Sequence, residues 1–464
     1  MKQFSCLPTV IGAFTALALV TMLQSSVIGV DAAPVPKPGS PAKVEIRNTD
    51  GRFQLFVNNQ AFSIKGAGVE HGSHEKLAAN GGNSLRTWST DNGRDTGKQF
   101  LDRALSNGLY VAMGLDVDHE RRGFDYSDTN RVAKQLAALK AQVMEFKDHP
   151  ALLLWVVGNE LNFEKNPKVW DAVNDLSKMI HEVDPNHPTT TTLAGFAQGT
   201  VNLVKTRAPD LDFISFQMYA DIANLPRYLQ AAKWDKPYIV SEWGATGHWE
   251  CGKTAWGAPI ENDSTTKADL YERRYKVVIE PDQKLCLGSY VFLWGNKQER
   301  TPTWYGMFLD SGEATAPVDV MHHTWTGAWP TNRSPRLVGA WLDGKTASQS
   351  VRLQSGQTYS AKVEASDPEG DTLTYRWDVM EESTETKIGG DAEAKPAHVE
   401  GVIAAPARSE ISLKAPAQPG AYRLFAYVFD GEGHAAHVNI PFFVDAAPKT
   451  QQAAAAAAAN IGQP

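Results

Sequence analysis

The chain has 464 residues, of which 42% are hydrophobic and 21% charged, and it contains 37 glycines and 26 prolines. This composition excludes a mainly disordered or fibrous chain, and the length suffices for about three domains, although one (β/α) barrel alone takes about 250 residues. The formal net charge of -8 at pH 7 gives no general attraction to nucleic acid or to an anionic membrane, so we expect a neutral partner. The 13 tryptophans favour a carbohydrate, because sugar rings pack on exposed indoles, although core packing explains most single tryptophans.

The N-terminus has the pattern of a secretory signal peptide. Lys2 precedes an apolar stretch that ends near Leu23, and a small-residue site follows at Ala32. We therefore expect residues 1–32 to be cleaved and the mature protein to be secreted or periplasmic. The apolar stretch is shorter than the ~20 residues of a spanning helix, so no membrane span is expected after cleavage. An uncleaved N-terminal anchor is the alternative.

Strand-like and helix-like runs alternate through most of the chain. Residues 33–43 are rich in proline and predict a linker, and the alternation around Asp50-Gly51 predicts a β-hairpin. Eight strands alternating with helices predict an α/β protein with a (β/α)8 TIM barrel over residues 44–330, the hairpin included. A doubly wound sheet is less favoured because no G-x-G-x-x-G follows the first strand. The eight strands are expected at 62–66, 84–88, 109–114, 151–157, 189–193, 213–216, 238–240 and 287–293.

The pattern changes near Pro335. Residues 335–445 show short alternating runs between turn clusters, which predicts a β-sandwich of about 100 residues. The turns at 365–371 and 430–433 resemble those of immunoglobulin-like modules of the polycystic-kidney-disease and cadherin-like type. A polar junction at 331–334 predicts that barrel and sandwich are separate folding units. Residues 446–464 are rich in alanine and predict a disordered tail.

No metal or other cofactor is expected. Asp367 and Asp371 carry oxygen atoms that suit calcium, but acidic turn residues are usually solvated. Signal cleavage removes Cys6 and leaves Cys251 and Cys286, which is too few ligands for zinc. These two thiols could pair in an oxidising compartment. The predicted barrel places them at opposite ends, however, and Cα atoms beyond ~7 Å cannot be bridged.

Two carboxylates occupy the ends of predicted strands. The fourth strand ends in Asn159-Glu160, and the seventh ends in Ser241-Glu242 followed by Trp243. Side chains at the C-terminal ends of barrel strands converge on one face, where barrel enzymes carry their active sites. A glycosidic bond is cleaved by one protonated carboxylic acid and one ionised carboxylate. The isolated dipeptide is usually a solvated turn, but the pair at two strand ends predicts glycosidase chemistry.

These strand-end motifs resemble those of the clan A glycoside hydrolases, and most closely the barrel domain of glycoside hydrolase family 2. A fainter similarity is to the fungal β-1,3-glucanosyltransferases, which share the Asn-Glu and Ser-Glu signatures. The resemblance spans residues 44–325. The chain departs from family 2 because it lacks the large N-terminal β-domains and has no histidine before Tyr219.

The resemblance implies a role for each of several residues. Glu160 is the acid/base, Glu242 is the nucleophile, and Asn159 hydrogen-bonds the sugar 2-hydroxyl. Arg86 is the cation that keeps the nucleophile ionised, and Tyr219 hydrogen-bonds that nucleophile. Trp88, next to the end of the second strand, is expected to bind substrate, and Trp294 is expected to form the aromatic floor.

The loop after the seventh strand carries more aromatic residues than a loop normally exposes, which predicts sugar platforms; packing within the loop is the alternative. These residues are Trp243, His248, Trp249 and Trp256.

Another group of polar residues follows the first and third strands. They would contact sugar hydroxyls or merely cap loops, and the Asp-x-Asp-His cluster among them is weak evidence for a metal. The residues are Glu70, His71, Asp116, Asp118 and His119.

The leading hypothesis is a secreted retaining β-glycoside hydrolase that acts on a β-linked glycan, with β-glucan favoured. A transglycosidase would use the same residues. A non-catalytic carbohydrate-binding envelope protein, or an adhesin built on the sandwich, is disfavoured because a pure binder needs no acid and nucleophile together. The sequence does not set the sugar, the linkage, exo or endo action, or the oligomeric state.

Overall fold

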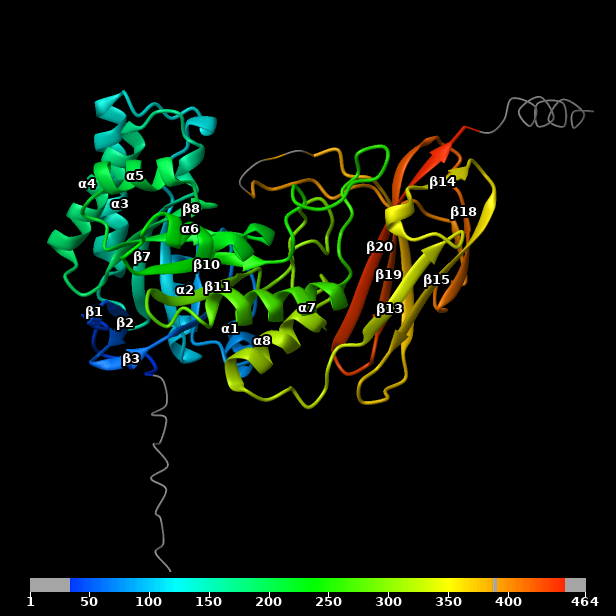
Figure 1. The fold of residues 1–464 in the computed structure, drawn as a ribbon, viewed down its shortest axis with the longest axis horizontal. Coiled ribbons are helices and arrows are strands. Elements are labelled where there is room, and N and C mark those ends of the chain that lie inside the picture. Colours follow the sequence, from blue (N-terminus) through cyan, green and yellow to red (C-terminus); the bar gives the residue numbers. More distant parts are fainter. Residues whose placement is uncertain (1–33, 386, 388–389, 447–464) are drawn as a thin grey trace, which may run out of the picture. The chain divides into compact units, whose positions relative to one another are not determined.

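The computed structural model describes residues 34–385, 387 and 390–446 (Figure 1). The predicted signal peptide and, apart from Ala446, the predicted alanine-rich tail lie outside the described residues. Within these ranges no helix is both long and apolar enough to cross a membrane.

A small antiparallel sheet precedes the barrel. Its first turn is the predicted one, with φ of 51° at Asp50 and 78° at Gly51, as a two-residue hairpin turn of type I′ requires. A second turn at Asn58 and Asn59, also with positive φ, adds a third strand that the sequence analysis did not include. The three strands are β1 (Val44–Thr49), β2 (Arg52–Val57) and β3 (Gln60–Phe62).

Eight parallel strands close into a barrel in chain order, which confirms the predicted TIM barrel. Each predicted strand overlaps one of these, although the first begins two residues later than expected because Phe62 belongs to β3. The strands are β4 (Ile64–Gly68), β5 (Ser84–Arg86), β6 (Tyr110–Leu115), β7 (Leu152–Asn159), β8 (Thr189–Ala194), β9 (Phe213–Gln217), β10 (Tyr238–Gly244) and β11 (Cys286–Phe292).

Amphipathic helices cover the outside of the barrel. In α4 the residues Val169, Val173, Leu176 and Ile180 are buried, as their helical spacing predicts. The helices are α1 (His74–Ala79), α2 (Gly97–Ser106), α3 (Thr129–Phe146), α4 (Lys168–Val183), α5 (Gln198–Arg207), α6 (Leu225–Ala231), α7 (Ser264–Arg274) and α8 (Ala316–Thr326).

The C-terminal part consists of two mainly antiparallel sheets around a core of its own, consistent with the predicted β-sandwich. Its kinship with immunoglobulin-like modules stays a prediction. One sheet contains β13 (Arg336–Leu342), β15 (Thr358–Ser366), β17 (Ile403–Ala404) and β18 (Glu410–Lys414), and the other contains β12 (Ala314–Thr315), β14 (Val351–Gln354), β16 (Thr374–Glu381), β19 (Gly420–Phe429) and β20 (His434–Asp445).

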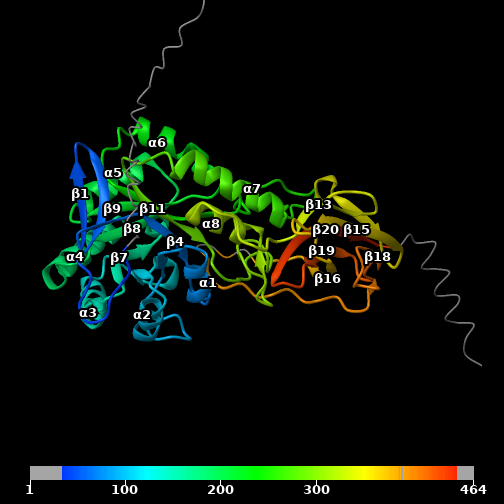
Figure 2. The same cartoon turned by 90° about the horizontal axis from the view of Figure 1, so that it is seen from below.

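The junction between barrel and sandwich is tightly connected. β12, which lies just before barrel helix α8, pairs with the start of β20, and α7 lies against β13 and β20 (Figure 2). Buried Glu261 accepts hydrogen bonds of 2.6 Å from Lys267 and from Asn439 of the sandwich. The described residues from Pro34 onward belong to one compact unit. Removing the sandwich would take away Asn439 but would leave Glu261 paired with Lys267 of the barrel. Independent folding of the two domains therefore stays a prediction.

Candidate active site

The two strand ends that carry carboxylates are locally distorted. The register with the neighbouring strand shifts between Val156 and Asn159 in β7, and between Val240 and Glu242 in β10. Such β-bulges redirect side chains near active sites. At the end of β7 the backbone also turns sharply, since Glu160 has a positive φ of 52°, which is uncommon for a residue with a side chain.

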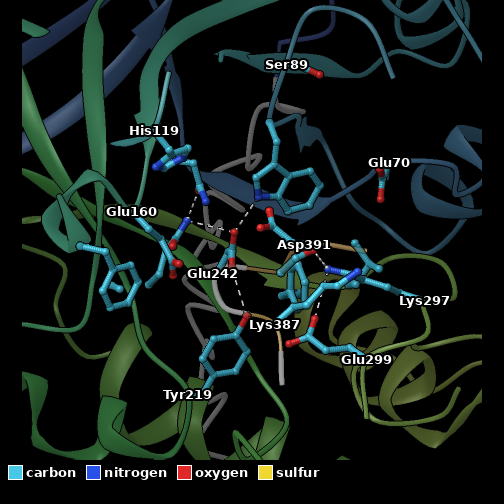
Figure 3. Close-up of a pocket in the computed structure, with 18 of the residues that line it drawn as sticks. Glu70, Ser89, His119, Glu160, Tyr219, Glu242, Lys297, Glu299, Lys387 and Asp391 are labelled. Carbon is cyan, nitrogen blue, oxygen red and sulfur yellow. Dashed lines mark hydrogen bonds and ion pairs between the residues drawn. The ribbon is translucent and has the colours of Figure 1, made fainter. Parts of the chain in front are cut away.

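Gly158 makes this turn feasible. It has a φ of 76°, and a Cβ atom at this position would lie 2.4 Å from Leu161 Cδ1. Only glycine therefore fits here without a shift of neighbouring atoms. The local sequence places Glu160 in a cavity at the C-terminal end of the barrel (Figure 3).

This cavity has a volume of about 830 Å³, within the usual range for small-molecule sites. It brings together most of the residues expected from the sequence. Five of them line it: Trp88, Asn159, Glu160, Tyr219 and Glu242. Buried Arg86 hydrogen-bonds Glu242 and Asn159.

Glu242 is 5% exposed and accepts four hydrogen bonds from side chains. Its Oε1 accepts from Arg86 Nη1 at 2.6 Å and from Trp88 Nε1 and Gln217 Nε2 at 2.9 Å. Its Oε2 accepts from the Tyr219 hydroxyl at 3.0 Å. Burial raises the pKa of Tyr219 well above its usual value, so this hydroxyl stays a donor. Every partner donates, which suits a charged carboxylate held in one orientation.

Asn159 shares these donors. Its Oδ1 accepts from Arg86 Nη2 at 2.6 Å, from Gln217 Nε2 at 2.8 Å and from Thr192 Oγ1 at 3.2 Å. Because three donors fix the orientation of the amide, its Nδ2 group is the part left to donate to a ligand. An amide donor at this position can bind a hydroxyl oxygen of a ligand.

Glu160 has the opposite surroundings. Within the part of the chain that the structure describes, no side chain donates a hydrogen bond to its carboxyl group. Burial, and next the charge of Glu242, raise the pKa of Glu160 to about 8. A carboxyl group in this position keeps its proton near neutral pH and can act as an acid.

Two of the expected substrate-binding tryptophans do not reach the cavity. Trp243 is fully buried and packs on Tyr271 and Tyr275 with ring centroids 5.7 and 6.0 Å away. It follows Glu242 in β10, and consecutive strand residues point to opposite faces. Its expected role as a sugar platform is therefore wrong.

Trp294 is also fully buried, donates from Nε1 to Ser73 O at 3.1 Å and packs on Phe308. The expectation that it forms the aromatic floor is wrong, because β11 ends at Phe292 and the strand alternation stops there. Phe292 lines the cavity instead and meets Trp88 edge to face at 5.8 Å.

The aromatic loop after β10 divides between two hollows. Trp249 lines the catalytic cavity and is 57% exposed. His248 lies beside it, and burial lowers the pKa of His248 to about 4, so the ring is neutral. Trp256 instead lines a second hollow of about 700 Å³ beside the sandwich and packs on Phe443.

Only some of the remaining polar candidates lie at the cavity. Glu70, Asp116 and His119 line the catalytic cavity, whereas His71 and Asp118 do not. His119 is buried, with its Nδ1 2.6 Å from Glu164 Oε1, and this contact ties the loop after β6 to the segment after β7.

Gln217 and Phe163 also line the cavity but were not among the predicted site residues. Gln217 bridges Glu242 and Asn159, and its only signal is its place at the end of β9, directly before Met218 and Tyr219. Phe163 lines the cavity and is 52% exposed. The signal that could have found it is an aromatic residue three positions after Glu160.

Both thiols of the described chain are unpaired, at Cys251 and Cys286. In the sandwich, oxygen atoms of Asp367, Asp371 and Asp430 lie within 4.8 Å of one another. Asp367 Oδ1 accepts three backbone N–H bonds within its turn, so the turn itself accounts for this acidic residue.

Residues 106–258 match the family model for glycosyl hydrolases family 2, TIM barrel domain. This range contains Asn159, Glu160, Gln217, Tyr219 and Glu242. No curated protein matches the chain.

Several solved structures match at low identity. The β-glucuronidase of Ruminococcus gnavus bound to a C6-substituted uronic isofagomine has 14% identity and a TM-score of 0.49, over 61% of this chain and 52% of that one. The β-glucuronidase of Bacteroides uniformis has 13% identity and a TM-score of 0.47, over 87% and 48%. That of Dictyoglomus thermophilum has 16% identity and a TM-score of 0.47, over 61% and 54%. The chain spans about half the length of these enzymes.

The family match covers the strands that carry both carboxylates, and the closed barrel has the topology that this match requires. It confirms the resemblance predicted from the strand-end motifs. The central barrel is therefore similar to the TIM barrel domain of the glycosyl hydrolases of family 2.

Proposed function

We propose that the protein is a retaining β-glycoside hydrolase with Glu242 as nucleophile and Glu160 as acid/base. The observation that carries this proposal is the contrast between the two carboxylates in one cavity. Four side chains hydrogen-bond Glu242, whereas Glu160 has a raised pKa. Double displacement begins with an ionised nucleophile and a protonated acid, and these surroundings suit Glu242 and Glu160 for those two roles.

The reaction then proceeds in two steps. A Glu242 oxygen attacks the anomeric carbon while Glu160 gives its proton to the departing glycosidic oxygen, so that one C–O bond forms as the other breaks. Glu160, now ionised, takes a proton from water, and the hydroxide oxygen displaces Glu242 from the opposite face. Arg86 and Tyr219 hold the nucleophile in position, and the Nδ2 group of Asn159 binds the sugar hydroxyl next to the reacting carbon.

The substrate class is a separate hypothesis. The β-glucan preference rests on the fainter resemblance to the glucanosyltransferases and on the aromatic loop after β10, and the family match does not support it. The solved structures named above are β-glucuronidases, so a β-glucuronide belongs among the substrates to be tested. Transfer to a sugar acceptor stays the alternative outcome of the second step. We also propose secretion or export to the periplasm, on the signal-peptide pattern of residues 1–32.

A substrate panel tests the activity directly. The mature chain from residue 33 would be incubated with aryl α- and β-glycosides of glucose, galactose, mannose and glucuronic acid and with β-1,3-, β-1,4- and β-1,6-glucans. Hydrolysis confined to β-linked substrates, and lost in Glu160→Gln and Glu242→Gln, supports the proposal. Binding of glycans without turnover by the folded protein would contradict it and favour the non-catalytic envelope protein.

A further inference from the structure

One wall of the catalytic cavity comes from the C-terminal domain. The chain leaves the end of β16 after Glu381 and returns at Ala397, whose carbonyl accepts from Glu381 N at 3.0 Å. Between these points the sandwich sends out residues 390–395, which we call the wall segment. Gly390 and Asp391 of this segment, together with Lys387, line the cavity that contains the two catalytic carboxylates.

Charged contacts hold the wall segment against two loops of the barrel. Asp391 accepts from Arg121 Nη2 at 3.3 Å and lies 3.7 Å from Arg122. The carbonyl of Gly390 accepts from Lys297 Nζ at 2.7 Å.

A third contact is more buried than these. Glu393 accepts from the backbone N–H of Arg300 at 2.6 Å and lies 3.6 Å from its guanidinium. The Glu393 side chain is 1% exposed, and breaking a buried pair of this kind is costly because one charge is left without a partner. The wall segment is therefore fixed to the barrel rather than resting on it.

The two loops define which side of the cavity the wall segment covers. Arg121 and Arg122 follow β6, and Lys297 and Arg300 follow β11, so the segment spans the part of the rim above β4 and β5. In Figure 3, Asp391, Lys387 and Lys297 lie on the far side of Glu242 from Glu160.

Catalysis itself fixes the direction of the substrate. Glu160 must contact the glycosidic oxygen, so the leaving group lies on its side of the cavity, where exposed Phe163 follows β7. The sugar that Glu242 attacks, and any units attached to its non-reducing end, extend the other way. That direction leads to the wall segment.

We propose that the wall segment forms the glycone end of the substrate site, so that the C-terminal domain limits how many sugar units fit beyond the cleavage point. This inference rests on the proposed function. It makes the enzyme act from chain ends, releasing a short and fixed number of units. It also gives the sandwich a part in the site, beyond any role in binding polymers.

The product pattern from a chain labelled at one end tests this proposal. The probe is a hexasaccharide with a fluorescent label at its reducing end, of the sugar and linkage that the panel selects, such as laminarihexaose for a β-1,3-glucanase. The wild-type protein should first produce a single labelled product shortened by one fixed step. The variant Asp391→Ala/Glu393→Ala, with the wall released, should produce several labelled sizes from the start.

Lys395→Ala is the matched control, because Lys395 belongs to the same segment but pairs with exposed Asp310 outside the cavity. It should leave the product pattern unchanged. Thermal melting checks folding, and Asp391→Asn serves if the double variant does not fold, with a smaller spread of products expected.

Several labelled products from the wild-type protein at early times would overturn the proposal, as would an unchanged pattern in a folded wall variant. Failure of the proposed function is distinguishable, because then the aryl glycosides and the hexasaccharide would both remain intact with every variant.

Discussion

The ends of β7 and β10 both present a glutamate to the same cavity, yet they place it in opposite surroundings. At β10, Glu242 accepts hydrogen bonds from Arg86, Trp88, Gln217 and Tyr219. At β7, a left-handed turn holds Glu160 without such donors, and burial raises its pKa. One residue type thus supplies both a nucleophile and an acid, and the neighbouring side chains decide which is which.

The largest effect should follow from removing the carboxylate at β10. Glu242→Ala abolishes the covalent route, so we expect a loss of activity greater than the about 10² to 10⁴-fold that removal of an acid/base causes. Azide can enter the vacated space and attack the α face of the anomeric carbon, so the rescued product from a β-glycoside should be the α-glycosyl azide. Rescue that yields the β-azide would reverse the assignment of the two glutamates.

The loss in Glu160→Ala should depend on the leaving group. Formation of the glycosyl-enzyme needs no proton when the leaving group is a dinitrophenolate, so that substrate should show a fast first turnover, whereas an alkyl glycoside loses about 10² to 10⁴-fold. Azide should now yield the β-glycosyl azide, because it attacks the β face of the anomeric carbon in the glycosyl-enzyme and displaces Glu242. Equal losses with both leaving groups in a folded variant would speak against Glu160 as the acid.

The alkaline limb of the pH profile of kcat/KM should reflect the pKa of Glu160. Because its pKa is raised to about 8, activity should persist through neutral pH and fall as the pH rises past about 8, when the acid loses its proton. The measurement is kcat/KM on an aryl β-glycoside between pH 4 and 10. An alkaline limb near pH 5, or a limb near 8 that survives in Glu160→Gln, would contradict the assignment.

The smallest expected effect is on thermal stability. It should have opposite signs when Glu160 and when Glu242 is replaced by glutamine. The folded-state pKa of Glu160 lies above the 4.5 of an ordinary glutamate side chain. Its contribution to stability is therefore present below pH 4.5 and is lost as the pH rises toward about 8. Glu160→Gln should therefore melt at a higher temperature than the wild-type protein at pH 8, with little difference at pH 4.5.

Glu242→Gln should instead be destabilised by about 1 to 3 kcal/mol, because buried Arg86 loses a charged acceptor. Melting curves of both variants at pH 4.5 and 8 make the comparison. Stabilisation of Glu242→Gln, or destabilisation of Glu160→Gln at pH 8, would show that the two sites do not differ as described.

The sequence predicted the parts of the site that depend on local pattern. Alternation of strands and helices indicated the barrel, and Glu160 and Glu242 follow directly from their places at strand ends. The prediction that Trp243 contacts sugar was wrong, although the strand pattern could have corrected it. Trp243 follows inward-pointing Glu242 in the same strand, so its side chain points outward. Trp294 could not be placed in this way, because it lies beyond the end of β11.

Contacts between distant segments were beyond the reach of the sequence. Gln217 matters only because the bulge in β10 brings Glu242 beside it. Asp391 belongs to another domain and reaches the cavity through Arg121 and Arg122. The raised pKa of Glu160 likewise depends on how closely the cavity walls pack, which no motif records.

Retention of configuration tests the central claim most directly, because it follows only if Glu242 attacks the sugar. Hydrolysis of an aryl β-glycoside from the active panel would be followed by proton NMR at high enzyme concentration, before the product sugar mutarotates. We predict that the β-anomer appears first, since two inversions at the same carbon restore the configuration. Appearance of the α-anomer first would mean direct attack by water and would contradict the role of Glu242 as nucleophile and the family resemblance on which it rests.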